Sequence, residues 1–185
     1  MIGETLFGRY AYWKVLAGLA TGELRSAHVQ EISRKTGLSA GMASGVLRRL
    51  ERLGIVSREK RGNQHVYSMG AGPVQKEIRR LVFLALLEDL GIVSKLLEQN
   101  PAIISIALYG SRARGDSSED SDVDLLVIAS PGKALDLSGQ GRKAGLDFNI
   151  QTYTPGAFLK MKSGDQAFYN QVARNHIILH GGELP

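Results

Sequence analysis

Two short apolar runs, AIISIALY at 102–109 and DVDLLVIAS at 122–130, stand close together in the chain. Each has the length and the β-branched content of a buried strand. Gly110-Ser111 follows the first run at a turn, and Asp122 and Asp124 enter the second. Alternate residues of a strand share a face, so the two carboxylates point the same way. The chain is therefore expected to fold a sheet that carries paired carboxylates next to a glycine turn.

This arrangement is suited to phosphate and metal chemistry. Two neighbouring carboxylates repel each other unless a divalent cation neutralises them, and Mg²⁺ prefers carboxylates together with nucleotide phosphates. Gly110 lets a triphosphate approach the backbone, and Ser111 can donate to it beside the first amides of the next helix. Arg112 or Arg114 can offset charge on a pyrophosphate leaving group. GSRARGDS is not a P-loop, because Asp116 stands where that motif has its lysine.

Ten residues, 112–121, separate Gly110-Ser111 from Asp122-Val123-Asp124. The pattern GS-x10-DxD, with the apolar strand before it and LLVI after it, resembles the nucleotidyltransferases of the DNA polymerase β superfamily. The resemblance implies a small mixed-sheet fold over 100–185 that transfers a nucleoside monophosphate from an NTP to an acceptor hydroxyl. It implies two Mg²⁺ ions with the bound NTP, Asp122 and Asp124 as catalytic metal ligands, and a nucleotide site formed by Gly110, Ser111, Arg112 and Arg114. Minimal members include antitoxins that nucleotidylate partner toxins, so a protein acceptor is among the expected partners.

Active members of that superfamily use a third carboxylate on a later strand. The candidate strand is AGLDFNIQTYTPGAF at 144–158, where Asp147, Asn149 and Gln151 alternate at intervals of roughly 6.6 Å, so only one lies beside the metals. Asp147 would complete the catalytic and metal-binding triad. Anchoring on Tyr153-Thr154-Pro155 instead puts Asn149 or Gln151 at the family's position, where a neutral amide is a poor base. The sequence leaves these alternatives open.

Positive charge is concentrated in the first part of the chain. Residues 1–72 carry 11 Lys and Arg against 5 Asp and Glu, residues 73–99 are neutral, and residues 100–185 have a net charge of −1. A basic segment of this kind is typical of contact with a polyanion. Cysteine is absent, which excludes disulfides and thiolate metal sites.

The same basic segment has the periodicity of three helices, at 6–19, 28–35 and 39–53, and of a hairpin, 55–61 with 64–69, that turns at Gly62-Asn63. This order resembles the winged helix-turn-helix family. The resemblance implies a domain over 1–72 whose third helix enters the major groove of double-stranded DNA while the hairpin contacts the backbone. The residues expected to contact DNA are Ser39, Ser44, Arg48, Arg49, Arg58, Lys60, Arg61 and His65.

The start of the third helix, Ala40 to Gly45, offers only Ser44 as a hydrogen-bonding side chain toward a base edge. Bidentate Arg, Asn or Gln side chains, which read bases most specifically, are missing there. DNA binding with little sequence specificity is therefore expected. A winged helix used for protein contacts is the alternative.

Residues 73–99 are predicted to form a linker helix with Gly91 as a point of interruption. Its apolar surface suits packing against both domains or against a second copy in a homodimer. The expected fold class is α+β, in a soluble cytoplasmic protein that does not contact the membrane. Two functions follow. One is a Mg²⁺-dependent nucleotidyltransferase coupled to a DNA-binding winged helix. The other is a DNA-binding transcriptional regulator whose nucleotidyltransferase fold is catalytically impaired and only senses a nucleotide or a partner.

Overall fold

The computed structural model describes residues 11–21, 24, 26–118, 121–132, 134–164 and 166–184. The chain divides into two compact units, one up to Leu86 and one from Leu87 onward. The predicted domain limits, 1–72, 73–99 and 100–185, are finer than this division and stay predictions. The first residues of the helix predicted over 6–19 lie outside the described part. Among the described residues no helix is both long and apolar enough to cross a membrane.

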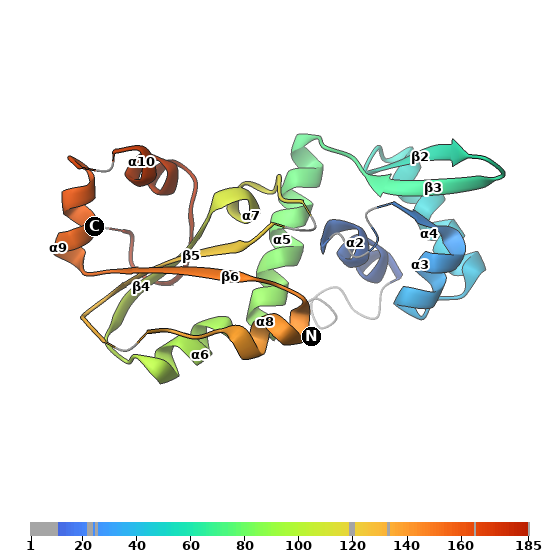
Figure 1. Ribbon diagram of the computed structural model, residues 1–185. Helices are drawn as coiled ribbons and strands as arrows, with labels where there is room; N and C mark the ends of the chain where they lie inside the picture. Colours follow the sequence, from blue (N-terminus) through green and yellow to red (C-terminus); the bar gives the residue numbers. More distant parts are fainter. Residues whose placement is uncertain are drawn as a thin grey trace. The chain divides into compact units, whose positions relative to one another are not determined.

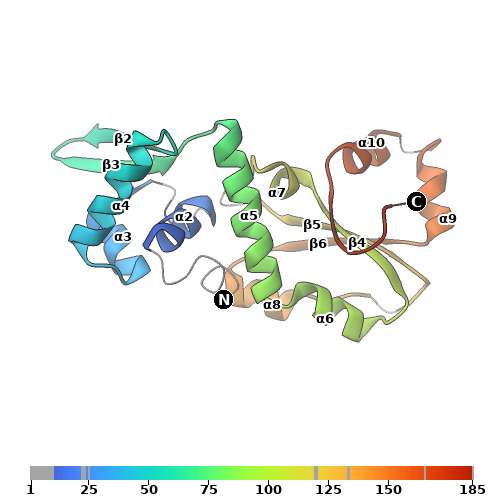
Figure 2. The same ribbon diagram turned by 180° about the vertical axis from the view of Figure 1, so that it is seen from behind.

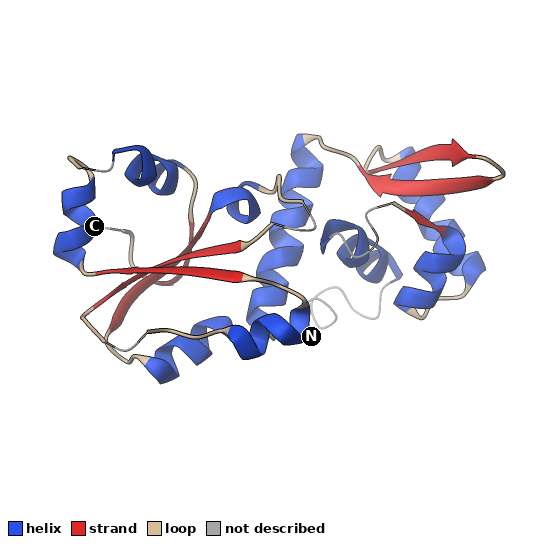
Figure 3. Ribbon diagram, in the orientation of Figure 1, coloured by secondary structure: helices blue, strands red, loops and turns tan. Residues whose placement is uncertain are grey.

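The N-terminal unit combines helices with a small antiparallel sheet (Figures 1 and 3). The strands have the order β1-β3-β2. Strand β3 is therefore central and pairs antiparallel with β2 on one side and with the short strand β1 on the other. The sequence pattern indicated the hairpin but not β1, whose two residues are too few to show a period. The elements of the unit before α5 are α2 (Ala11–Thr21), β1 (Ala27–His28), α3 (Val29–Thr36), α4 (Ala40–Arg52), β2 (Val56–Arg61) and β3 (Gln64–Met69).

Helix α4 is amphipathic, and its apolar stripe forms much of this unit's core. Ala43, Leu47 and Leu50 are buried on it at intervals of three and four residues. Ser39 caps the helix, because its side chain accepts a hydrogen bond from the Met42 amide at 3.2 Å. The stripe packs with buried residues of α2, α3 and the hairpin in one cluster.

The segment predicted as a linker helix with an interruption at Gly91 forms two helices, α5 (Pro73–Asp89) and α6 (Ile92–Gln99). Gly91 lies between them with a φ of +64°, a left-handed conformation that a glycine adopts without strain. Its amide donates to the Glu88 carbonyl at 2.9 Å, which closes the last turn of α5. Gln75 of α5 donates to the Gly54 carbonyl at 2.6 Å and so fixes the start of α5 to the end of α4.

The C-terminal unit is built on a four-stranded sheet in the order β6-β5-β4-β7 (Figure 2). Strand β4 pairs antiparallel with both β5 and β7, whereas β5 and β6 are parallel. Two helices, α9 and α10, follow the last parallel strand. The elements after α6 are β4 (Ile103–Tyr109), α7 (Gly110–Arg114), β5 (Val123–Ala129), α8 (Ser138–Ala144), β6 (Phe148–Tyr153), α9 (Pro155–Met161), α10 (Gln166–Arg174) and β7 (Ile177–Gly181).

Alternation along the strands sorts side chains between the two faces of this sheet. Leu126 and Ile128 of β5 pack with Phe158 of α9 and Val172 of α10 in one buried cluster. Asp124 belongs to the same alternate set as Leu126, so its carboxylate lies on the α9–α10 face near the end of the sheet where β5 begins. Helices α6 and α8 run along the other face (Figure 2).

Candidate functional site

The turn after β4 brings a glycine backbone against a carboxylate. The β4–β5 register pairs Tyr109 with Asp124, which sets Asp124 beside Gly110. Gly110 has a φ of +74°, and a Cβ at this position would collide with Asp124 Oδ2. A glycine is thus required at position 110 for two reasons: the backbone is left-handed, and the carboxylate of Asp124 lies where a Cβ would be. The turn then opens directly into α7, where Ser111 is half-buried.

The two predicted carboxylates differ in exposure. Asp124 is half-buried, whereas Asp122 is exposed and comes just before the first residue of β5. Between them Val123 is fully buried, and its amide donates to the Asp147 carbonyl at 2.8 Å. This bond holds the start of β5 against the chain that leads into β6.

The position beside Asp124 on the next strand is occupied by Asn149. The parallel β5–β6 register pairs these two residues, and Asn149 Nδ2 donates to Asp124 Oδ1 at 3.0 Å. An ionised carboxylate can only accept, so the amide nitrogen and not its oxygen faces Asp124. Gln151 lies one step further along β6, paired with Leu126, and its Oε1 accepts from Tyr153 OH at 2.7 Å.

Asp147 lies elsewhere. It is exposed and lines a hollow of about 820 Å³ between α8 and β6, together with Ser138, Arg142 and Phe148. Of the residues between which the sequence could not choose, Asn149 is therefore the one that the structure puts against Asp124. Asp147 stays a predicted catalytic residue, and the bond that joins it to β5 comes from its backbone carbonyl, which accepts from the Val123 amide.

Arg112 and Arg114, the arginines predicted to face a nucleotide, lie in different environments. Arg112 is only 3% exposed, and its Nη2 donates to the Ser121 carbonyl at 2.9 Å. Its burial lowers the pKa of its guanidinium from the ordinary value. Arg114 is exposed and forms an ion pair from Nε to Asp116 Oδ2 at 3.1 Å. Arg112 thus holds the backbone at Ser121, directly before Asp122, through a hydrogen bond. Arg114 is the more accessible of the two cations.

Tyr109 is a feature of this site that the sequence analysis did not single out. It is 3% exposed, and its ring meets that of Phe168 edge to face at 5.7 Å. Burial raises the pKa of Tyr109 to about 12, and the negative charge of Asp124 and the Tyr153 hydroxyl add to the rise. The phenol is therefore neutral at ordinary pH, and its buried ring lies beside Asp124. The sequence feature that could have pointed to Tyr109 is its position directly before Gly110.

The side chains of the site fit part of the expected metal chemistry. Mg²⁺ is commonly held by one or two carboxylates plus substrate phosphates, and Asp122 and Asp124 can supply these carboxylates. Within the described part of the chain no three His, Cys, Asp or Glu side chains are grouped so that they could hold a metal ion. The residues thus fit one cation with a nucleotide, but the three-carboxylate set for two ions is not assembled around Asp124.

Some of the basic residues of the N-terminal unit border a groove of about 630 Å³, which the acidic Glu31 also lines. It is lined by Arg34 of α3, Arg48 of α4, Arg58 of β2, and the two histidines His28 and His65. The sequence analysis had not included Arg34 and His28, because periodicity alone does not show that α3 and β1 border the same groove as the hairpin.

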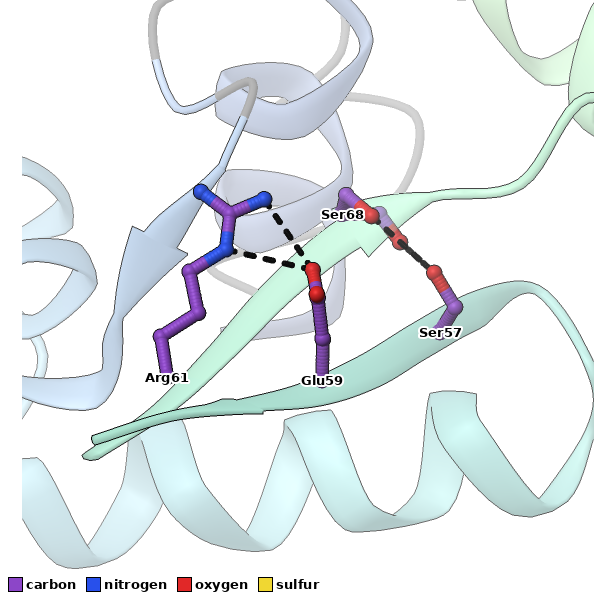
Figure 4. A network of polar contacts seen from close by, with 4 residues as sticks. All are labelled: Ser57, Glu59, Arg61 and Ser68. Carbon is purple, nitrogen blue, oxygen red and sulfur yellow. Dashed lines mark hydrogen bonds and ion pairs between the residues drawn. The ribbon is translucent and has the colours of Figure 1, made fainter. Parts of the chain in front are cut away.

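The hairpin's own cations do not all face this groove. Arg58 points toward α4 and pairs with Glu51 at 3.0 Å. Arg61 lies on the alternate face of β2, where its Nε and Nη2 both donate to Glu59 Oε2 at 3.1 and 3.0 Å (Figure 4). On that same outer face the Ser57 and Ser68 hydroxyls are 3.0 Å apart. Two of the predicted phosphate contacts are therefore already paired with carboxylates.

The exposed face of α4 carries two glycines, which have no side chains. Gly41 and Gly45 are both exposed, and a Cβ added to either would meet nothing within 4 Å. Ser44 beside them is half-buried and borders the groove, and Arg49 is exposed toward the end of the helix. The hydroxyl of Ser39, predicted as a DNA contact, serves as the helix cap described above.

Comparison with known proteins bears on the C-terminal unit. The family model described as Polymerase beta, Nucleotidyltransferase matches residues 92–181. No curated protein matches the chain.

Three solved structures resemble part of the chain. A toxin–antitoxin structure with AMP-PNP aligns with a TM-score of 0.38 and 21% identity over 52% of this chain and 74% of its own. A mutant of the toxin–antitoxin MntA–HpeT aligns with 0.38 and 19% over 50% and 73%. A proposed nucleotidyltransferase from Sulfolobus solfataricus aligns with 0.34 and 18% over 62% and 93%. At TM-scores this low, these similarities do not establish a shared fold or function. By the family match, residues 92–181, just under half of the chain, are similar to that nucleotidyltransferase family.

Proposed function

We propose that this chain is a DNA-binding protein of the winged helix-turn-helix type whose C-terminal nucleotidyltransferase domain binds a nucleoside triphosphate together with Mg²⁺. The observation that carries the nucleotide site is the Asp124 carboxylate held against the backbone of Gly110, where no other residue fits. Because no side chain stands at the start of α7, the Asp124 carboxylate lies directly against this turn, and a cation that it held would lie beside a triphosphate bound at Gly110 and Ser111. Asp122 and Asp124 are the ligands for the cation that accompanies it.

The reaction that this family match favours is transfer of a nucleoside monophosphate from the NTP to an acceptor hydroxyl. Bound Mg²⁺ would supply electrostatic stabilisation of the transferred phosphoryl group and the leaving pyrophosphate. In this chain Ser111 can donate to a phosphate, and Arg114 at the surface can turn toward the pyrophosphate. Arg112 keeps the loop before Asp122 in place through the Ser121 carbonyl. The buried ring of Tyr109, the register partner of Asp124, keeps water away from that side of the carboxylate.

A second candidate is a transcriptional regulator that binds the nucleotide as a signal and does not turn it over. Asn149 favours this function, because the residue beside Asp124 on β6 is an amide and not a carboxylate. An amide cannot take a proton from an acceptor hydroxyl at ordinary pH. The two candidates share the nucleotide site and differ in whether pyrophosphate is released.

DNA binding is supported by the groove of the N-terminal unit, where Arg34, Arg48 and Arg58 come together from three different elements. Cations from separate elements around one groove are suited to phosphate groups along a DNA backbone. The bare start of α4, with Gly41 and Gly45, provides close approach but few base-reading side chains, which fits binding with little sequence specificity.

A homodimer in the cytoplasm is part of this proposal. Val74 and Leu81 are 60% and 48% exposed and lie two turns apart on α5, an apolar pair that a second copy could cover. Sedimentation of the full chain tests this, with Leu81→Gln expected to favour the monomer.

The experiment that tests the proposed function measures both ligands on one variant. Asp122→Asn combined with Asp124→Asn is expected to abolish Mg²⁺-dependent NTP binding in a calorimetric titration. The same variant is expected to bind duplex DNA with unchanged affinity by fluorescence anisotropy. Nucleotide binding that survives both substitutions would contradict the proposed site.

A further inference from the structure

The side chain facing Asp124 from β6 carries no charge, and this limits how much positive charge the site can hold. Asp124 and Asn149 are register partners on parallel strands, and their side chains are joined by a hydrogen bond of 3.0 Å. The bond is directional, since the amide N–H donates and the carboxylate accepts. It occupies one oxygen of Asp124, while the other, Oδ2, lies against Gly110.

We propose that this site binds its nucleoside triphosphate with a single divalent cation, and that Asn149 takes the place of a ligand that would hold a second one. The proposal rests on the nucleotide site inferred above and goes beyond it by fixing the number of cations and the residue that sets it. A second cation beside Asp124 needs another anionic ligand within reach. In the described part of the chain no three-residue group of metal-binding side chains provides one.

The amide also affects Asp124 directly. By donating to Oδ1, Asn149 satisfies part of the negative charge that a second cation would otherwise neutralise. Turning the amide so that its oxygen faced a cation would lose this hydrogen bond and bring no negative charge in return. Asp147 does not take this position, because the β5–β6 register pairs Asn149 with Asp124, and Asp147 lines the hollow between α8 and β6.

A single-cation site has a defined consequence for function. The chain's own residues hold the triphosphate at Gly110 and Ser111, but the residue beside Asp124 on β6 is an amide, which cannot take the proton of an acceptor hydroxyl. The nucleotide is therefore retained intact, and the second of the two candidate functions is the one that the residues favour.

The test counts cations directly. Mn²⁺ bound per chain is measured by electron paramagnetic resonance at saturating non-hydrolysable NTP, for wild type and for Asn149→Asp. We expect one Mn²⁺ per chain in the wild type and two in Asn149→Asp. The matched control is Thr152→Asp, which adds the same charge on β6 at an exposed position of the opposite alternate set, and it is expected to keep one.

Asn149→Ala separates loss of the amide from gain of a carboxylate and is also expected to keep one Mn²⁺. Two Mn²⁺ ions in the wild type would overturn the inference while leaving the nucleotide site intact. This outcome is read from the wild type alone, so it does not depend on whether any variant folds. A wild-type count of one that does not rise in a folded Asn149→Asp would overturn the role of Asn149. A wild type that binds no nucleotide at any Mn²⁺ concentration would refute the proposed function itself.

Discussion

Replacing Gly110 with alanine tests how the site is built. The residue has a φ of +74°, and an alanine held in this left-handed region costs about 1–2 kcal/mol. The added Cβ would also collide with Asp124 Oδ2, so the carboxylate must move and the hydrogen bond from Asn149 is lost. A hydrogen bond of this kind contributes about 0.5–1.5 kcal/mol. The free energy of unfolding of the C-terminal unit is therefore expected to fall by about 1.5–3.5 kcal/mol.

Gly145→Ala is the matched control in the same unit. Gly145 has a φ of +64°, but a Cβ there would meet nothing within 4 Å, so only the backbone cost of about 1–2 kcal/mol applies. In a unit of this size 1 kcal/mol corresponds to roughly 4–8 °C in the melting temperature, so calorimetry resolves the two variants. Mg²⁺-NTP is expected to stabilise Gly145→Ala but not Gly110→Ala. Equal destabilisation with equal nucleotide binding in both variants would refute the account of the Gly110–Asp124 contact.

Three further predictions concern other parts of the chain. Gly41→Ala and Gly45→Ala should each raise the free energy of unfolding of the N-terminal unit by about 1 kcal/mol, because both lie in α4 with open space around them; a lower denaturation midpoint would contradict this. Tyr109 should ionise near pH 12 in a spectrophotometric titration, so the stability it gives is complete below pH 10 and is lost between about pH 10 and 12; ionisation near 10 would show that its ring is not buried. Neutralising the hairpin cations should weaken duplex DNA binding and reduce the salt slope by up to about 0.9 for each phosphate contact removed, and an unchanged slope would exclude the hairpin as a DNA contact. The residues changed to glutamine in this last test are Arg58, Lys60 and Arg61.

Much of the C-terminal unit was predictable because its strands are short, apolar and bounded by turn residues. The runs before Gly110 and after Asp122 became β4 and β5, as predicted, and Gly110 lies at the turn between β4 and α7. Helix α8 was not predicted, since SGQGRKA holds two glycines and few apolar residues and gives no amphipathic period.

The identity of the residue beside Asp124 depends on register, which the sequence does not contain. A shift of the β5–β6 pairing by two residues would put Asp147 or Gln151 next to Asp124 with the same alternation. Three-dimensional pairing is equally needed to see that Arg112 turns inward to the Ser121 carbonyl. Charge counting likewise treats Arg61 as a cation for a partner, although it forms an ion pair with Glu59.

A crystal structure of the chain with Mn²⁺ and a non-hydrolysable NTP tests the central claim most directly. The account predicts the triphosphate against Gly110 and Ser111, and one anomalous Mn²⁺ peak within ligand distance of the carboxylates of Asp122 and Asp124. A nucleotide bound elsewhere, or a cation held without either carboxylate, would contradict it.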